Sequence, residues 1–159
     1  MPEGDSVFRT AVRLDQALAG APLTTTDLRW PELSTLDFRG VTTTEVVSRG
    51  KNILQRLANG VTIHSHLRMT GSWQVYPLGA QWRRSPRRAW LIMRRGDREV
   101  VQFDGPVLEL MTDARTRFDQ RIAGLGPDLV SPAPFDDAAY LRRLREDDPT
   151  RPIGDTLLD

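Results

Sequence analysis

Eight short segments rich in threonine, valine, isoleucine and aromatic residues follow one another after Pro22, and they limit the chain to a mainly β fold. Turn signals such as Asn59-Gly60, Gly96-Asp97 and Asp104-Gly105-Pro106 separate them. Strands joined by turns this short predict antiparallel pairing in a sandwich or barrel, not alternating βαβ units. The expected strands are Leu23–Trp30, Val41–Ser48, Asn52–Leu57, Val61–Leu67, Ser72–Tyr76, Ala89–Arg95, Glu99–Phe103 and Val107–Met111.

We expect an antiparallel β-sandwich over residues 22–123, flanked by an N-terminal helix over residues 5–19. Val7, Ala11, Leu14 and Leu18 recur at helical spacing, and Gly20 is a typical C-terminal stop. Strands consecutive in the sequence are expected mostly to pair with each other. The side chains expected in the core or in sheet packing are Trp30, Trp73, Val75, Leu91, Met93, Val101 and Phe103.

The composition of the sequence changes between residues 124 and 134, where glycine and proline are frequent. This stretch is typical of a linker. Beyond it, residues 135–146 are expected to form a helix, and residues 152–159 the opening turns of another. We therefore expect residues 1–130 to form the sandwich domain and residues 131–159 to begin a second domain that is incomplete in this chain.

The basic side chains are unusual in kind and in placement. The chain of 159 residues carries 22 basic and 21 acidic side chains, and Lys51 is the single lysine. Residues 81–98 hold seven arginines against one aspartate. Such a segment suits phosphate contact through counterion release and bidentate hydrogen bonds, although a solvated loop is an equal alternative. We expect Arg83, Arg84, Arg87 and Arg88 to be exposed and mobile.

Several classes of site and location are excluded or weakened by composition. The chain has no cysteine, so it forms neither disulfides nor thiolate zinc sites. Its N-terminus lacks a secretory signal and no apolar run has membrane length, which indicates a cytoplasmic protein. His64 and His66 project to one face of an expected strand, where a metal site and a paired structural role both stay open.

The N-terminal Pro2 is a candidate nucleophile if Met1 is removed. An α-amino group titrates near ~7.7–8.0, so part of it is neutral at pH 7. A secondary amine that attacks an aldehyde-level carbon gives a cationic iminium, which favours a neighbouring elimination. Glu3 is placed to protonate a departing or ring-opening oxygen. The alternative is that Pro2 occupies the first helical turn because its missing N–H costs nothing there.

Five motifs together resemble a known family. They are Pro2-Glu3-Gly4-Asp5, residues 49–52 (RGKN), residues 66–73 (HLRMTGSW), residues 124–129 (GLGPDL) and residues 151–159 (RPIGDTLLD). In this order they are similar to the Fpg/Nei family of DNA glycosylase/AP lyases, and most like its endonuclease VIII branch of high-GC bacteria. The resemblance covers essentially the whole chain.

The resemblance implies a role for each matching residue. Pro2 would be the nucleophile at C1′ of the damaged nucleotide, and Glu3 the neighbouring acid–base group. Lys51 and His66 would contact DNA phosphates. Met69 would fill the space left by a flipped base, a task that suits a long, flexible apolar side chain. The further expected DNA contacts are Arg68, Arg87 and Arg88.

Three departures from the family pattern shape the functional expectation. Asp5-Ser6 replaces the family's frequent Pro-Glu, so a second carboxylate near the nucleophile is missing or moved. Residues 104–107 (DGPV) replace the Arg-Phe-Gly motif of the Fpg branch, which favours oxidised pyrimidines over 8-oxoguanine. The chain also stops before the rest of a helix–two-turn–helix module and a four-cysteine zinc finger. We therefore expect no cofactor in this chain, and zinc only in the absent finger.

The resemblance implies a bifunctional DNA glycosylase/AP lyase of base excision repair. Its partner would be double-stranded DNA with a damaged base or an abasic site. We expect a monomer that does not bind membranes and associates with the bacterial nucleoid. Two alternatives from other classes stay open: a damaged-DNA-binding module without catalysis, and an unrelated small β-sandwich binding protein.

Overall fold

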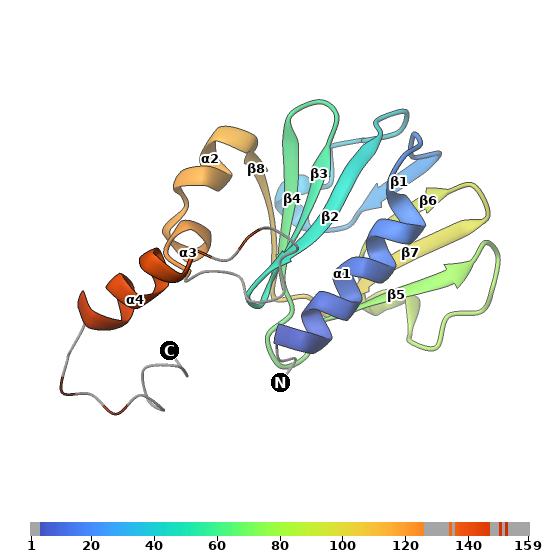
Figure 1. The fold of residues 1–159 in the computed structure, drawn as a ribbon. Helices are drawn as coiled ribbons and strands as arrows, with labels where there is room; N and C mark the ends of the chain where they lie inside the picture. Colours follow the sequence, from blue (N-terminus) through green and yellow to red (C-terminus); the bar gives the residue numbers. More distant parts are fainter. Residues whose placement is uncertain (1–3, 126–133, 135, 147–149, 151, 153–159) are drawn as a thin grey trace.

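The computed structural model describes residues 4–125, 134, 136–146, 150 and 152. Two four-stranded antiparallel sheets form a sandwich, and a long helix packs along one side of it (Figure 1). One sheet has the strand order β2-β3-β4-β8 and the other β1-β6-β7-β5. The expected mainly β sandwich is confirmed. The strands are β1 (Thr25–Leu28), β2 (Thr43–Arg49), β3 (Asn52–Leu57), β4 (Val61–His66), β5 (Ser72–Pro77), β6 (Ala89–Arg95), β7 (Arg98–Phe103) and β8 (Val107–Thr112).

Helix α1 (Gly4–Leu18) contributes one apolar face to the core. Val7, Ala11 and Leu14 are buried on it, as their spacing predicts, and the helix contacts strands of both sheets. The carboxylate of Asp15 accepts a hydrogen bond from the backbone N–H of Val46 at 2.7 Å. That bond fixes the helix against β2.

The main core lies between the two sheets and beneath α1. Trp73 of β5 is buried there and its Nε1–H donates to Ser65 Oγ of β4 at 3.0 Å, which links the two sheets. A second cluster, which includes Val101 and Phe103, packs beneath Trp82. Of the expected core residues, Trp73, Leu91, Met93, Val101 and Phe103 are buried, and Trp30 and Val75 are partly buried.

The expected antiparallel pairing is confirmed, whereas the expectation that consecutive strands mostly pair holds for only three of the six strand pairs that the structure describes. All strand pairs are antiparallel, but among the described residues only β2–β3, β3–β4 and β6–β7 join neighbours in the sequence. The other pairs are β1–β6, β4–β8 and β5–β7. Between β4 and β5 and between β7 and β8 the chain crosses from one sheet to the other, and these crossings place the loops beside each other.

The last part of the expected sandwich is helical instead. Helices α2 (Asp113–Phe118) and α3 (Gln120–Ala123) follow β8 directly and cover the outer face of its sheet (Figure 1). Ile122 of α3 is buried against Leu54 and Met111. Packing of this one apolar side chain, together with the end caps, stabilises helices too short to persist alone.

The remaining elements are short. Two 3-10 helices, η1 (Pro31–Leu33) and η2 (Pro86–Arg88), interrupt the loops, and α4 (Asp137–Glu146) confirms most of the helix expected over residues 135–146. The helix expected over residues 152–159 falls almost entirely outside the described residues. None of the described helices is long and apolar enough to cross a membrane.

Candidate functional site

The expected nucleophile Pro2 and its neighbour Glu3 lie outside the described residues, so their roles stay predictions. The first described turn of α1 carries an exposed ion pair between Arg9 and Asp5 at 2.7 Å. In Figure 1 the start of α1 and the loop between β4 and β5 lie at the same end of the sandwich. Pro2 and Glu3 therefore come just before a helix that begins at the same end of the sandwich as the β4–β5 loop.

Lys51 lies in the two-residue loop that joins β2 to β3. Gly50, the other loop residue, has φ +56°, a backbone conformation that glycine adopts without strain. The last cross-strand pair before the loop is Arg49 with Asn52, and on the next strand Asn52 stands opposite His66. The hairpin register therefore brings Lys51 to the end of β4, where His66 lies.

His66 ends β4 and lies within reach of two positive charges. Its pKa is lowered by partial burial and then by the charges of Arg68 and Lys51. Its Nδ1 accepts a hydrogen bond from the backbone N–H of Arg68 at 3.2 Å, so the neutral ring carries its hydrogen on Nε2. Lys51, His66 and Arg68 thus form a group of hydrogen-bond donors that suits an anionic oxygen.

Residues 68–71 form a tight loop with Met69 exposed at its tip. Arg68 has φ +46°, and the backbone N–H of Gly71 donates to the Leu67 carbonyl at 2.9 Å. A Cβ atom on Gly71 would lie 2.7 Å from that carbonyl oxygen, so the loop requires glycine here. Met69 is 71% exposed, so its side chain is not part of the core and is open to a partner.

Two arginines of the basic segment are paired with a carboxylate. Arg83, Arg87 and Arg88 are exposed, but Arg84 is only partly so. Arg84 Nη1 and Arg88 Nε donate to the two carboxylate oxygens of Asp104, at 2.8 and 2.6 Å. Asp104 follows β7 with φ +53°. The expectation that all four arginines are exposed is therefore wrong for Arg84, because Asp104 draws its guanidinium inward.

Asp104 also connects the basic segment to the Met69 loop. Thr70 Oγ1 donates to the Asp104 carbonyl at 3.3 Å, while the Asp104 backbone N–H donates to the Arg88 carbonyl at 3.0 Å. Segments 68–71 and 84–88 are therefore joined through one turn. The expected DNA-binding residues fall into two groups, Lys51–His66–Arg68 and Arg87–Arg88, with Met69 on the loop that links them.

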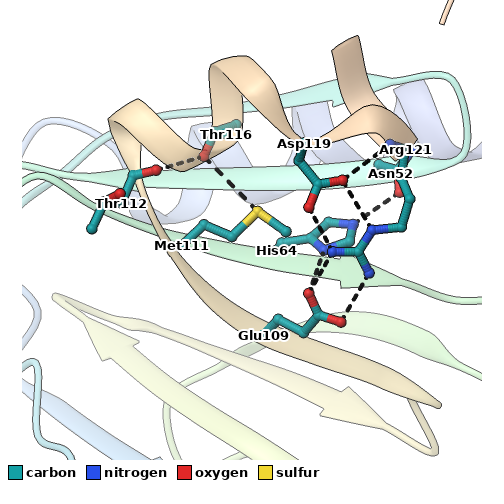
Figure 2. A network of polar contacts seen from close by, with 8 residues as sticks. All are labelled: Asn52, His64, Glu109, Met111, Thr112, Thr116, Asp119 and Arg121. Atoms are coloured by element: carbon teal, nitrogen blue, oxygen red, sulfur yellow. Dashed lines mark hydrogen bonds and ion pairs between the residues drawn. The ribbon is translucent and has the colours of Figure 1, made fainter. Parts of the chain in front are cut away.

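His64 belongs to a structural network. It is 1% exposed, and its Nε2 lies 2.8 Å from Asn52 Oδ1. Arg121 of α3 donates to both carboxylate oxygens of Glu109 at 2.9 and 2.8 Å and also binds Asp119 (Figure 2). Among the residues that the structure describes, no group of three or more His, Asp or Glu could hold a metal ion. The structural role expected as one alternative for His64 is therefore the one supported.

The charged residues of this network shift one another's pKa values. Arg121 lowers the pKa of Asp119 to about 2 and also lowers the pKa of Glu109, in both cases chiefly by hydrogen bonding. Burial lowers the pKa of His64, although Glu109 opposes it from 3.7 Å. No sequence motif points to Glu109, Asp119 or Arg121. The one available signal is Glu109 itself, a charged residue within an otherwise apolar strand.

Comparison with known proteins gives a consistent family. Residues 1–121 match the family described as formamidopyrimidine-DNA glycosylase N-terminal domain. Over its full length the chain is 45% identical to the probable endonuclease 8 2 of Streptomyces coelicolor and 38% identical to the DNA-(apurinic or apyrimidinic site) lyase Nei2 of Mycolicibacterium smegmatis. It covers 56% and 60% of those relatives, so it spans less than two thirds of their length.

Solved structures share the fold. A Lactococcus lactis formamidopyrimidine-DNA glycosylase bound to DNA with an AP site superposes with a TM-score of 0.68 at 22% identity, over 99% of this chain and 60% of that one. MutM in complex with DNA containing carbocyclic 8-oxo-G gives a TM-score of 0.68 at 20% identity, over 91% of this chain and 57% of that one.

Proposed function

The chain belongs to the formamidopyrimidine-DNA glycosylase family, and from this membership we propose that it is the catalytic part of a bifunctional DNA glycosylase/AP lyase. Its partner would be double-stranded DNA that carries an oxidised base or an abasic site. The observation that carries the proposal is the group Lys51–His66–Arg68 beside the exposed Met69. A cationic group next to an exposed apolar side chain suits a phosphate backbone with one unstacked nucleotide.

The proposed chemistry uses the N-terminal secondary amine. Its nitrogen would form a bond to C1′ while the glycosidic bond breaks, and the base would leave with the bonding pair and take up the proton that the nitrogen loses. Opening of the sugar ring, with protonation of the ring oxygen by Glu3, gives a cationic iminium. Loss of a C2′ proton then expels the 3′ phosphate by β-elimination, and water releases the amine.

The described residues would bind and distort the DNA. Lys51, as a compact point charge, would contact a phosphate, and His66 would donate a hydrogen bond from Nε2. Arg68, Arg87 and Arg88 would extend the contact along the backbone. Met69 would enter the stack in place of the flipped base, which offsets part of the few kcal/mol that flipping costs.

Oxidised pyrimidines are the proposed preferred substrate. The turn after β7 reads Asp104-Gly105-Pro106 instead of Arg-Phe-Gly, and the Asp104 carboxylate is occupied by Arg84 and Arg88. Relatives named endonuclease 8 2 support the expected similarity to the endonuclease VIII branch, on which this preference rests. The domain division at residue 130 also stays part of the proposal.

Borohydride trapping on an abasic duplex tests the proposal in the full-length protein. The wild type is expected to give a covalent adduct, and Pro2→Gly to lose it while DNA binding persists. Pro31→Gly, at the start of η1, is the matched control and should trap normally. Mass spectrometry of the mature chain verifies that Met1 is removed. A wild type that binds damaged DNA, lacks Met1 and never traps would be a binding module instead.

A further inference from the structure

A side-chain hydrogen bond joins the two residues that flank the Gly50-Lys51 loop. Asn52 Nδ2–H donates to the Arg49 carbonyl at 3.1 Å. Because the amide nitrogen is used there, the Asn52 oxygen faces the next strand, where it meets His64 Nε2 at 2.8 Å. The ring must therefore donate from Nε2, and it fixes the orientation of the Asn52 amide.

His64 is expected to lower the stability of the fold compared with an apolar residue at this position. It is 1% exposed, and its Nδ1 has no hydrogen-bond partner within the described part of the chain. The Nδ1 lone pair lies 3.7 Å from a Glu109 carboxylate oxygen. A buried polar atom without a partner costs stability, so an apolar side chain of similar volume would suit the packing better. Buried polar atoms normally have hydrogen-bond partners, and exceptions to this rule are expected at functional sites.

The other side of the loop is also held. The end of α3 brings Leu125 so close to Gly50 that a Cβ on Gly50 would lie 3.3 Å from Leu125 Cδ1. Helix α3 is fixed to β8 by the Arg121–Glu109 pair and is capped by Asp119 (Figure 2). The loop is therefore bracketed by the Asn52–His64 pair and by Leu125.

We propose that His64, acting through Asn52, is a positioning residue that holds the Lys51 loop in its phosphate-binding geometry. The inference rests on the proposed function, which assigns a DNA phosphate to Lys51. The lysine side chain is long and flexible, so a fixed backbone is the means by which the fold directs its ammonium group. His64 touches no DNA in this proposal. Its effect on binding passes through the Asn52 amide and the Arg49 carbonyl.

The test is the salt dependence of binding to a duplex with a tetrahydrofuran abasic-site analogue. The slope of log K against log salt concentration is negative, and removal of one phosphate contact lowers its magnitude by about 0.9. A variant that only destabilises the fold keeps the slope of the wild type. Lys51→Ala sets the reference for such a removal. His64→Leu and Asn52→Ala are expected to lower the slope similarly, and neither should lower it further in a Lys51→Ala background. His64→Gln, which retains a donor, should restore most of the slope.

Gln55→Leu is the matched control. Gln55 is buried on the same strand as Asn52, where its Nε2–H donates to Thr43 Oγ1 at 2.8 Å, away from the loop. This variant should lower the melting temperature and leave the slope unchanged. The positioning role is overturned if Lys51→Ala lowers the slope and the folded His64 and Asn52 variants do not. A Lys51→Ala protein with the wild-type slope would refute the phosphate contact and this inference with it, and trapping by Pro2 would still decide the catalytic proposal.

Discussion

The Arg88 guanidinium donates from Nε to the Asp104 carboxylate at 2.6 Å, across sixteen positions of sequence. Arg84 binds the other carboxylate oxygen of the same residue. One carboxylate thus offsets part of the positive charge of the basic segment and pairs with two of its arginines. Arg83 and Arg87 are exposed members of the segment that make no such pair with Asp104.

We expect the double variant Arg83→Glu/Arg87→Glu to weaken non-specific binding to duplex DNA. The salt slope should fall by about 0.9 for each phosphate that the variant no longer neutralises. Fluorescence anisotropy at several salt concentrations measures both quantities. Reversals at Arg13 and Arg39, which are exposed and lie outside residues 81–98, serve as the charge-matched control. If the slope of the Arg83/Arg87 variant stays that of the wild type, the segment faces away from the duplex.

Acid should destabilise the fold through the histidines. In the unfolded chain a histidine binds its proton near pH 6.5, whereas burial lowers the pKa of both His64 and His66 in the folded chain. Between the folded and unfolded pKa values the unfolded state binds more protons, so stability falls as pH decreases below about 6.5. The slope is at most about 1.4 kcal/mol per pH unit for one proton.

Urea unfolding between pH 7.5 and 5.5 measures this dependence. His64→Leu should flatten it more than His66→Gln, because His64 is the more deeply buried of the two. The carboxylates with lowered pKa act at more acidic pH and do not contribute in this window. A His64→Leu variant with the wild-type pH dependence would mean that His64 titrates normally in the folded protein.

The strands could be predicted from the sequence, whereas their partners could not. Asn52–Leu57 and Ala89–Arg95 begin and end where the residue composition and the flanking turn residues indicate. Pairs such as β4–β8 depend on how the two sheets pack, which no local pattern records. Helices α2 and α3 carry little helical periodicity because most of their residues are charged or polar. Their stability comes from the Thr112 and Asp119 caps and from Ile122.

The candidate site, too, could be predicted from the sequence only in part. Motifs predict Lys51, His66 and Met69, and the structure adds the hairpin register and exposure that place them. In the sequence Asp104 is typical only of a turn. Its partners lie sixteen and twenty positions earlier, and their approach depends on the loop between β5 and β6 folding back over β7.

Asp119 should stabilise the short helix α3 in two separable ways. Its side chain accepts from the Arg121 backbone N–H at 3.0 Å as an N-cap, and it pairs with the Arg121 guanidinium at 2.8 Å. Asp119→Ala removes both and should cost about 1 kcal/mol for the cap. Asp119→Asn retains a cap acceptor and should cost less.

The pH dependence separates the charge of Asp119 from its role as a cap. Arg121 lowers the pKa of Asp119 to about 2, so the carboxylate stays ionised in the folded protein well below its ordinary range. The stability difference between the wild type and Asp119→Asn should therefore persist at pH 5 and vanish towards pH 2. Urea unfolding of both proteins over this range measures it. Equal stability of the two at pH 5 would mean that the ion pair with Arg121 contributes nothing.

Met69 should affect excision without affecting stability. Its side chain is 71% exposed, so Met69→Ala is expected to change the free energy of unfolding by less than about 0.5 kcal/mol. If Met69 fills the stack, its loss should slow base excision from a duplex and leave borohydride trapping on a single-stranded abasic oligonucleotide nearly unchanged, because a single strand needs no flipping. Leu78→Ala is the matched control, since Leu78 is an apolar side chain 51% exposed just after β5. Equal losses on both substrates, or a loss with Leu78→Ala as large as with Met69→Ala, would refute a wedge role for Met69.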